Sequence, residues 1–537
     1  MSSSASSVSS ADDAQVSEKG NAQAVGRAGR GFIWLTAAKL HFMLAGWAIY
    51  FVLPRLLGTV EFGQFLVVVG LVSILNNVMV SSAIQGASRY TAARPDELGA
   101  VLRAGLVLFL VTGLAATAIL VVGAPWIARA EADPALGPLY RVAAPIALAY
   151  ALYAVCIGSL NGRQRFGAQA GFDASYATLR LAAMISGAAL LGTAAGALAG
   201  YSAAAILICL TALILVGRRA LTDRRRSSGL TRTMIAFVAP LALHQLGVNL
   251  LMRTDLLMVK AFGGETAPLL RMDLLIVKAL GADVAPAGVS QADAASILSA
   301  HYGTAQIFAL VPYQALIALA MVVFPLVAHA ASSKEEGLMK KTAAGALRFA
   351  LIFGAGLAAV LAARPAGVID VLYPESYCAG GPALRWLAWG VVGLSLVTLC
   401  CAMLNAAGHT GRVVVLTFFA WAAQAAAVAV TLNAVTQPEH ALRYTALASG
   451  AALLLAGAAA VITVRLTFGA AVGGLTVLRV ALAAALATVA GAAIPGRSLV
   501  ITLAACLATL LLFFAVLVLL RELGRDDLGA VKRMLRK

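Results

Sequence analysis

The sequence predicts an all-α, polytopic membrane protein, and three observations carry this prediction. The chain of 537 residues is 61% hydrophobic and 12% charged, with a mean hydropathy of +0.91. A water-soluble domain carries about a quarter charged residues to cover its surface. Apolar runs long enough to cross a bilayer recur from residue 31 to residue 520, without the alternating ten-residue pattern of a membrane β-barrel.

A membrane-spanning helix needs about 20 predominantly apolar residues. Fourteen runs meet this length, at residues 31–53, 63–86, 101–123, 140–160, 168–191, 193–217, 234–262, 299–330, 343–363, 383–406, 413–434, 444–464, 471–493 and 498–520. Because the number is even, both termini are expected on the same side of the membrane.

The loops predict which side that is. The even-numbered loops carry Lys and Arg, as in "GRRALTDRRRSSGLTR" at 217–232, whereas odd-numbered loops hold "AEADPALGP" and "TQPEH". Since cytoplasmic loops are enriched in Lys and Arg, we expect a multi-pass membrane protein with both termini in the cytoplasm. The net charge of +17 follows from these loops and does not indicate a nucleic-acid partner.

The longest basic loop divides the spans into two lobes. The expected organisation is a disordered cytoplasmic tail at 1–30, an N-lobe of helices 1–6 at 31–217, a basic linker at 218–233, a C-lobe of helices 7–12 at 234–466, helices 13 and 14 at 467–520, and a basic cytoplasmic tail at 521–537. The first stretch is rich in Ser and Ala and has no apolar core, which is typical of disorder and not of a secretory signal peptide.

A tandem repeat interrupts the C-lobe. "LLMRTDLLMVKAFGGETAP" at 250–268 is followed by "LLRMDLLIVKALGADVAP" at 269–286, so that Asp255 and Lys260 recur 18 residues later. One helix through both copies would be about 70 Å long, whereas the hydrocarbon core is about 30 Å thick. We therefore predict that the helix stops at Gly263 and that 263–297 is an extracytoplasmic segment, either an external gate or a tolerated duplication in a loop.

Several stretches resemble a known family. "LPRLLGTVEFGQF" at 53–65, "LNGRQRF" at 160–166 and "LYPESYCAGGPALRWLAWG" at 372–390 are similar to bacterial polysaccharide and O-antigen flippases of the multidrug/oligosaccharidyl-lipid/polysaccharide exporter superfamily. The resemblance implies two six-helix lobes, alternating access, and movement of a lipid-linked glycan from the cytoplasmic to the outer leaflet of the bacterial inner (plasma) membrane. The second copy of the repeat departs from the family pattern.

Ionisable residues inside spans are costly and are by default functional candidates. The predicted substrate-binding residues are Lys39, Arg55, Arg89, Arg180, Arg253 and Arg348. A cavity lined by cations favours an anionic substrate, and the planar fork of Arg suits a pyrophosphate. The predicted ion-coupling residues are Asp255 and His244. Each also has a structural interpretation: interfacial anchoring, a charge pair with another helix, or a hydrogen-bonded core histidine.

The function predicted is a flippase for a polyprenyl-pyrophosphate-linked oligosaccharide, such as an O-antigen, capsule or exopolysaccharide repeat unit. The alternatives are a peptidoglycan-precursor flippase, a multidrug cation antiporter of the same superfamily, and a membrane glycosyltransferase. No P-loop, HExxH or GxSxG motif indicates nucleotide use or hydrolysis, so we expect a non-enzyme without a cofactor.

The six cysteines have neither metal-ligand nor disulfide spacing. The expected partners are the lipid-linked glycan, membrane lipids and a polysaccharide polymerase, with no nucleic acid, and the chain is expected to be a monomer.

Overall fold

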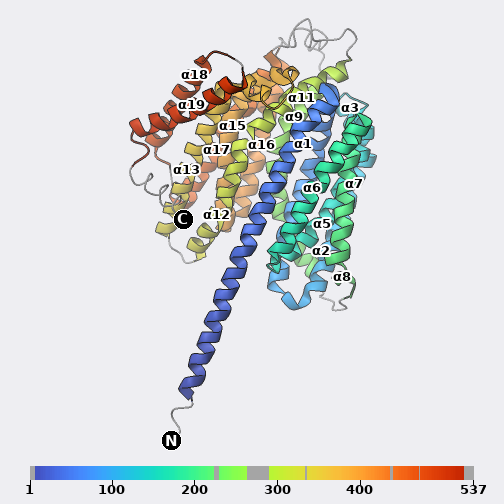
Figure 1. The fold of residues 1–537 in the computed structure, drawn as a ribbon, viewed down its shortest axis with the longest axis vertical. Coiled ribbons are helices and arrows are strands. Elements are labelled where there is room, and N and C mark those ends of the chain that lie inside the picture. Colours follow the sequence, from blue (N-terminus) through green and yellow to red (C-terminus); the bar gives the residue numbers. More distant parts are fainter. Residues whose placement is uncertain are drawn as a thin grey trace. The chain divides into compact units, whose positions relative to one another are not determined.

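The computed structural model describes residues 6–222, 229–262, 290–332, 336–435, 440–470, 472–496 and 498–524. Every regular element among them is helical (Figure 1). Thirteen described helices are long and apolar enough to cross a membrane. The first of these, Thr36–Ala93, has 58 residues, which is about 87 Å of helix. A kink at Gly58 divides it, so it supplies two crossings and the total is fourteen, as the sequence predicts.

Helix α1 (Ser6–Ala93) begins well before the first crossing. The composition predicts disorder for residues 1–30, but from Ser6 onward the described backbone is helical. Nucleation is the costly step of helix formation, and a helix already formed in the membrane extends past its end at small cost. The Ala, Gln, Glu and Lys residues of this stretch are also good helix formers.

The chain divides by its internal contacts into two compact units. Unit 1 comprises residues 1–53, 76–121 and 141–239. Its elements are the two ends of α1, η1 (Pro95–Glu97), α2 (Leu98–Val122), α5 (Pro145–Gly162), α6 (Phe166–Leu191), α7 (Ala194–Ala212), the π-helical turn η2 (Leu213–Gly217), α8 (Arg219–Thr222) and the start of α9 (Leu230–Phe262). Within it, α6 and α7 meet backbone to backbone, since a Cβ on Gly187 would lie 2.1 Å from the carbonyl oxygen of Gly196. Such close approach through small residues is common between membrane helices.

Unit 2 comprises residues 54–75, 122–140 and 240–537. Its elements are the middle of α1, α3 (Ala124–Ala130), most of α4 (Leu136–Ala143), most of α9, α11 (Gln291–Ala309), α12 (Val311–Ser332), α13 (Glu336–Ala363), α14 (Pro365–Asp370), η3 (Glu375–Gly380), α15 (Gly381–Ala406), α16 (Thr410–Ala434), α17 (Ala441–Phe468), α18 (Gly474–Ala493) and α19 (Leu499–Leu519). Helices α15 and α17 pack closely, since a Cβ on Gly390 would lie 2.5 Å from the Cα of Gly450.

The contact units do not follow the lobes drawn from chain order. Residues 54–75 and 122–140 fall within the expected N-lobe, but they pack with the C-terminal part of the chain in unit 2. The basis is burial: Phe62 and Asp133 from these segments are both enclosed within unit 2. A long basic loop marks a break in the chain's run through the membrane, but it does not determine which helix segments bury one another.

Helix α9 is described as far as Phe262. The Gly263–Gly264 pair lies outside the described residues, so the predicted end of the helix at Gly263 stays a prediction. The second copy of the repeat, at 269–286, lies outside the described residues, so its predicted interfacial position stays a prediction.

The last two crossings, α18 and α19, pack on α13. Arg348 on α13 is bonded to Glu522, just after α19. Arg364, which follows α13, donates to the carbonyl oxygens of Ile494 and Gly496 between α18 and α19. Helix α13 is therefore tied to this helical pair through one residue near its middle, Arg348, and through Arg364 directly after its C-terminal end.

Candidate functional site

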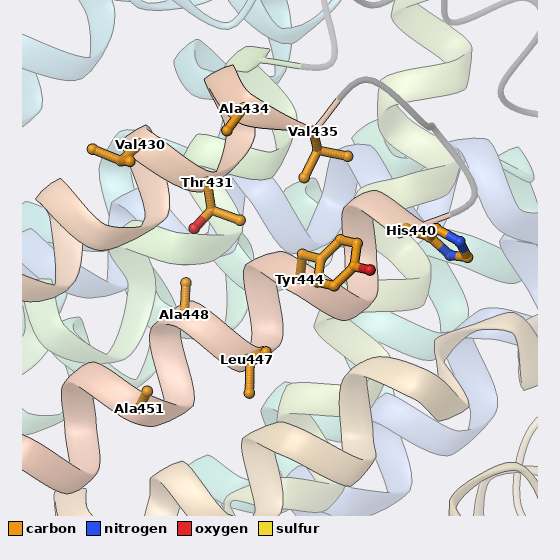
Figure 2. A pocket seen from close by; sticks show the side chains of 9 residues that line it. All are labelled: Val430, Thr431, Ala434, Val435, His440, Tyr444, Leu447, Ala448 and Ala451. Carbon is orange, nitrogen blue, oxygen red and sulfur yellow. The ribbon is translucent and has the colours of Figure 1, made fainter.

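A groove of about 560 Å³ lies between the end of α16 and the start of α17 (Figure 2). Its described lining is Val430, Thr431, Ala434, Val435, His440, Tyr444, Leu447, Ala448 and Ala451. None of the predicted substrate-binding residues belongs to this lining. The groove therefore offers no fixed positive charge from its described residues to an anionic substrate.

Asp255 is buried in the C-terminal half of α9, with 2% of its surface exposed. Its carboxylate accepts hydrogen bonds from the Tyr302 hydroxyl at 2.9 Å and the Gln306 side-chain amide at 2.7 Å, both on α11. The Ser449 hydroxyl on α17 donates a third at 2.9 Å, and Ser449 itself accepts from Gln424 at 2.9 Å. Within the described part of the chain, no cation lies at ion-pair distance from Asp255. The carboxyl group is thus held by neutral hydrogen-bond donors from α11 and α17.

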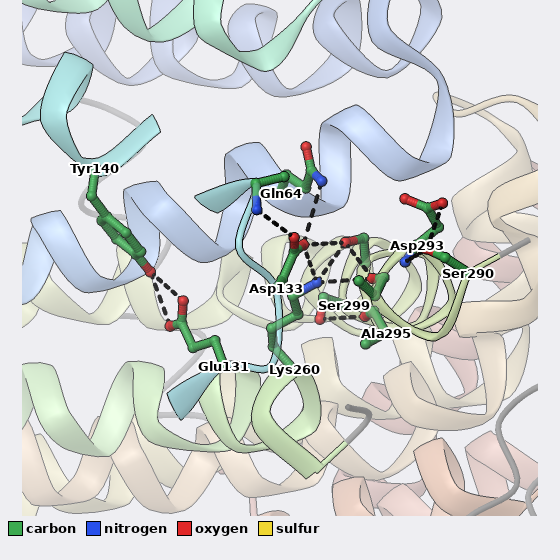
Figure 3. Close-up of polar contacts among 12 residues, drawn as sticks. Gln64, Glu131, Asp133, Tyr140, Lys260, Ser290, Asp293, Ala295 and Ser299 are labelled. Carbon is green, nitrogen blue, oxygen red and sulfur yellow. Dashed lines mark hydrogen bonds and ion pairs between the residues drawn. The ribbon is translucent and has the colours of Figure 1, made fainter. Parts of the chain in front are cut away.

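Lys260 lies five residues further along α9 and is fully buried. Its ammonium group is 2.7 Å from the Asp133 carboxylate, and it donates to the Ser296 hydroxyl at 2.7 Å and to the Ala292 carbonyl at 3.0 Å. The Gln64 amide on α1 reaches the same carboxylate at 3.4 Å. Figure 3 shows these side chains converging from α1, the α3–α4 loop, α9 and α11. A buried charge is tolerated when it is paired and hydrogen-bonded, and Lys260 meets both conditions.

Glu131 forms a second acidic site beside this pair (Figure 3). The Tyr140 hydroxyl lies 2.7 Å and 2.9 Å from the two carboxylate oxygens. Burial raises the pKa of Glu131 to about 7, against the lowering effects of the Tyr140 hydrogen bond and of the Lys260 charge. This carboxyl group therefore changes its charge near neutral pH, whereas a solvent-exposed Glu would be ionised there.

Arg180 is half-buried on α6, in unit 1. Its guanidinium lies over the ring of Phe42 at 4.7 Å and near the rings of Tyr176 and Tyr201 at 5.7 and 5.8 Å. One terminal nitrogen sits against α1, 3.5 Å from where a Cβ on Gly46 would be. Among the described residues no carboxylate lies at ion-pair distance, and the buried Nε has no acceptor. Aromatic faces attract the cation, but they leave its hydrogen-bond donors available.

Lys39 and His41 lie on α1 in unit 1, and both are exposed. Lys39 is near enough to Asp173 on α6 for the two charges to interact. Asp173 also accepts a hydrogen bond from the Tyr153 hydroxyl at 3.4 Å. His41 shares a hydrogen bond of 2.9 Å with Thr178. Lys39 thus belongs to the same unit as Arg180, with an acidic neighbour that Arg180 lacks.

Arg89 and Arg55 are both exposed and near the ends of the first two crossings. The Arg89 guanidinium stacks over Phe237 at 4.3 Å, in unit 1. Arg55 lies in unit 2 between Pro54 and the kink at Gly58. Arg89 therefore belongs to the same unit as Arg180, and Arg55 to the same unit as Asp255.

Arg253 and His244 are half-buried on α9. Arg253 has no hydrogen bond or ion pair with any described residue, and Asp255 is bonded to other groups. The Nδ1 atom of His244 is buried without a partner in the described part of the chain. The structure therefore places the two predicted ion-coupling residues at separate sites and provides a polar cluster only around Asp255.

Arg348 has a carboxylate partner. Its Nε is 3.0 Å from Glu522, which also accepts from Arg479 at 3.2 Å and from Thr476 at 2.9 Å. Burial by itself raises the pKa of Glu522, but the hydrogen bonds from Arg348, Thr476 and Arg479 outweigh it and hold the pKa below its ordinary value. Arg348 is thus engaged in the attachment of α18 and α19, which favours the structural interpretation over substrate binding.

Sequence reasoning missed the partners of the buried charges. Lys260 was visible as a charged residue in the seventh span, and Asp133 as an acid in the loop "AEADPALGP". Their pairing spans 127 residues of chain, and no local pattern encodes it. Tyr302 and Gln306 carried a usable signal, because polar residues four apart share one face of a helix.

The first copy of the repeat supplies both Asp255 and Lys260, the two most deeply buried charged residues of α9. Their counterparts in the second copy, Asp273 and Lys278, lie outside the described residues. The first copy therefore belongs to a spanning helix and provides the polar contacts of that helix that the structure describes.

Comparisons with known proteins identify relatives of the sequence and of the fold. The profile of the family described as "Polysaccharide biosynthesis protein" matches residues 28–331. No curated protein sequence matches significantly. The family match agrees with the resemblance seen in the sequence motifs.

Solved structures of similar fold include a lipid II flippase and a multidrug transporter. A structure titled lipid II flippase MurJ, inward closed conformation, has a TM-score of 0.67 and 12% identity, covering 90% of this chain and 99% of that one. An inward-facing multidrug resistance MATE family transporter of the MOP superfamily has a TM-score of 0.59 and 14% identity, covering 79% and 94%. At such identities the likeness establishes the fold alone.

Proposed function

Since the chain belongs to the polysaccharide biosynthesis protein family, we propose that it is a flippase for a polyprenyl-pyrophosphate-linked oligosaccharide in the bacterial inner membrane. The glycan would be a repeat unit of O-antigen, capsule or exopolysaccharide, and the protein would move it by alternating access. The fold supports a transporter, because it is shared with a lipid II flippase and with multidrug transporters.

Arg180 is the observation that carries the substrate assignment. An intramembrane cation without a counter-ion is costly, by at least about 2.5 kcal/mol on insertion scales. Arg180 has aromatic neighbours and no carboxylate at ion-pair distance among the described residues. A pyrophosphate would satisfy the guanidinium donors left over by the rings. Lys39 lies in the same unit, and Arg89, Arg55 and Arg253 are further candidates on the path of the head group.

Asp255 supports coupling to an ion. Its charge is not cancelled within the described protein, while four donors hold it in place: Tyr302, Gln306, Ser449 and the backbone amide of Leu256. Such a site can take up and release a proton or a monovalent cation without losing its geometry. The structure gives His244 no comparable surroundings, so in this proposal Asp255 alone couples transport to an ion gradient.

The substrate assignment is tested by export of the lipid-linked glycan in cells that carry Arg180→Gln at matched protein level. We expect a loss of roughly tenfold or more, because charge-assisted hydrogen bonds contribute about 1.5–3 kcal/mol. Arg180→Lys should be intermediate, since the charge remains but the two-pronged donor does not. Arg412→Gln is the matched control, because Arg412 is exposed and bonded to Thr467. Wild-type export by Arg180→Gln would refute the role of Arg180.

The ion-coupling assignment is tested in proteoliposomes under an imposed proton or sodium gradient. Asp255→Asn should remove the stimulation of transport by the gradient, while exposed Asp96→Asn should keep it. If Asp255→Asn responds to the gradient like the wild type, the carboxylate serves only the structure.

Topology has its own test. Reporters fused after residues 225 and 537 should read as cytoplasmic and one near residue 290 as extracytoplasmic, as the basic loops predict. A cytoplasmic signal near residue 290 would overturn the orientation.

A second candidate function is favoured by one observation. The lipid II flippase aligns with 90% of this chain, whereas the multidrug transporter aligns with 79%. Complementation separates the candidates: rescue of a strain depleted of its peptidoglycan-precursor flippase would favour that substrate, and rescue of an O-antigen flippase mutant would favour the first proposal.

A further inference from the structure

The segment "EFGQF" at 61–65 is enclosed within unit 2 although it belongs to α1. Phe62 and Phe65 are almost completely buried, and Gln64 is buried beside them. A Cβ placed on Gly63 would lie 1.9 Å from the carbonyl oxygen of Ser296 and 2.6 Å from its carbon. Real Cβ atoms do not approach so closely, so α1 and α11 touch backbone to backbone at this point and only glycine permits the contact.

Aromatic rings surround the same point. Phe62 packs edge-on to Tyr377 with ring centroids 5.8 Å apart and lies 6.3 Å from Tyr373. These tyrosines come from the "LYPESY" stretch, which follows α14. Two segments that the sequence shows as separate motifs, 61–65 and 372–377, therefore meet in one cluster.

A charged contact lies beside the rings. Gln64 donates to the Asp133 carboxylate, and Asp133 is the partner of Lys260. Ser296, whose backbone touches Gly63, also bonds the Lys260 ammonium group through its hydroxyl. The glycine contact and the ion pair are therefore joined through the same residue of α11.

Two polar side chains of this cluster are buried without hydrogen bonds to described residues. Both ring nitrogens of His301 and the hydroxyl of Tyr377 are buried without a hydrogen-bond partner among the described residues. Buried polar groups that lack partners are destabilising, and they would regain hydrogen bonds on contact with water. The contact is thus close in shape, and its opening would give these polar groups access to water.

The chain connections indicate what this closure would do. Residues 54–75 continue at both ends into unit 1, with the kinked Gly58 near one boundary. Residues 122–140, which carry Asp133, also continue into unit 1 at both ends. In the predicted topology the turn at Gly58 and the loop around Asp133 both face the extracytoplasmic side. Residues 54–75 and 122–140 are thus the parts of the first six crossings that belong to unit 2, and both include a predicted extracytoplasmic turn or loop.

We propose that residues 61–65 are the movable seal of an extracytoplasmic gate, whose closed form is the Gly63–Ser296 backbone contact latched by Lys260 and Asp133. This inference rests on the alternating access proposed above. Opening toward the outside separates α1 from α11, breaks the Gln64–Asp133 hydrogen bond and exposes His301 and Tyr377 to water.

The test is the rate at which a membrane-impermeant thiol reagent, added outside intact cells, labels Ser296→Cys in a background without the native cysteines. The reagent should react slowly when Gly63 is present, because Ser296 is covered. Gly63→Ala should increase the labelling rate by roughly tenfold or more, the order expected when an overpacked contact biases an equilibrium. Gly70→Ala is the matched control on the same helix, since a Cβ there meets only Leu256 at 3.7 Å and Leu257 at 3.8 Å.

Three results would overturn the proposal: labelling of Gly63→Ala no faster than of Gly70→Ala, rapid external labelling with Gly63 intact, and labelling only from the cytoplasmic side. Because labelling needs no substrate, it separates this proposal from the proposed function. Increased labelling of Gly63→Ala would support the gate. If, in addition, the protein with Gly63 intact moves no lipid-linked glycan, the gate stands and the proposed substrate is rejected.

A second measurement covers the case in which Gly63→Ala fails to fold. Gln64→Cys combined with Ser296→Cys leaves the Lys260–Asp133 pair intact and places two thiols around it. A short cleavable cross-link between them should block export and release it on reduction. Undiminished export by the cross-linked protein would mean that this contact does not open during transport.

Discussion

In unit 2, two of the charged side chains on spanning helices are neutralised by carboxylates of the same unit, Lys260 by Asp133 and Arg348 by Glu522. In unit 1, Arg180 faces aromatic rings instead, and no carboxylate lies at ion-pair distance among the described residues. The difference separates two roles for intramembrane cations. A cation with an internal carboxylate has its charge compensated within the protein, whereas the donors of one stacked on rings are unused by the described residues, as the substrate-binding role proposed for Arg180 requires.

The strongest way to break the comparison is to remove one member of the buried pair. Lys260→Met leaves Asp133 charged and unpaired in the interior, which we expect to lower the free energy of unfolding by about 3–5 kcal/mol. Lys260→Met combined with Asp133→Asn should recover most of this loss, because no buried charge remains. Thermal unfolding in detergent measures both variants.

The control for this prediction is the ion pair of Arg94 and Glu97, in which the side chains are 41% and 38% exposed. Glu97→Gln should change stability by less than about 1 kcal/mol. A similar small effect of Lys260→Met would show that the buried pair contributes no more than the exposed one.

The pH dependence of stability sharpens the comparison within unit 2. Burial raises the pKa of Glu131 from 4.5 to about 7, so the folded protein binds more protons than the unfolded chain between these values. The contribution of Glu131 is therefore fully present below pH 4.5 and is lost as the pH rises to about 7, by up to about 3 kcal/mol. The neighbouring charges are Lys260 and Asp133.

Unfolding temperatures of wild-type protein and Glu131→Gln, measured from about pH 4.5 to 8, test this linkage between protonation and stability. The variant is always neutral at residue 131 and should lose this part of the decline. Parallel profiles for the two proteins would contradict the assigned shift.

Arg253 is an exception to the comparison, because it lies in unit 2 but has no partner among the described residues. It therefore tests whether an unpaired cation binds a ligand in either unit. If such cations serve a ligand, Arg253→Gln should reduce glycan export about tenfold at normal protein level, equivalent to about 1.4 kcal/mol. Arg253→Lys should be intermediate. Adding Asp255→Asn should not restore export, because Asp255 is bonded to Tyr302, Gln306 and Ser449 instead. Restoration by the double variant would make Arg253 and Asp255 a structural pair.

The smallest expected effect is that of deleting residues 269–286, the second copy of the repeat. The first copy already supplies Asp255 and Lys260 to α9. A shorter connection alters loop-closure entropy only slightly, so export by the deletion variant should stay within about twofold of the wild type at equal protein level. Abolished export would assign the second copy a role as gate or partner site.

The sequence was sufficient for features that depend on local pattern. Apolar length predicted the crossings, and the motifs at 53–65 and 160–166, which lie within the range matched by the family, predicted the family. Each of these is encoded in a continuous stretch of chain. The burial of Asp255 and Lys260 could also be expected, because both interrupt an apolar run.

What could not be predicted is which distant groups meet. Arg348 looks like a free cation until Glu522 is placed beside it, 174 residues later. The lobes drawn from chain order likewise missed that residues 54–75 pack with the C-terminal part, since that depends on the fit of Gly63 against Ser296. Such contacts are set by tertiary packing, and neither hydropathy nor charge pattern contains them.

The attachment of α13 to the last two crossings has a consequence for biosynthesis. Arg364 is synthesised 130 residues before Ile494, whose carbonyl oxygen is its hydrogen-bond partner. At a ribosomal rate of about 5–20 residues per second, the delay is on the order of ten seconds. During that interval Arg348 and Arg364 lack their final partners, so the nascent chain carries two unfinished contacts until its last helical hairpin leaves the insertion machinery. A chain that ends after α17 lacks the last two crossings, so Arg348 and Arg364 have neither of these partners. We expect these two uncompensated cations to distinguish a truncated molecule from a finished one for quality-control proteases.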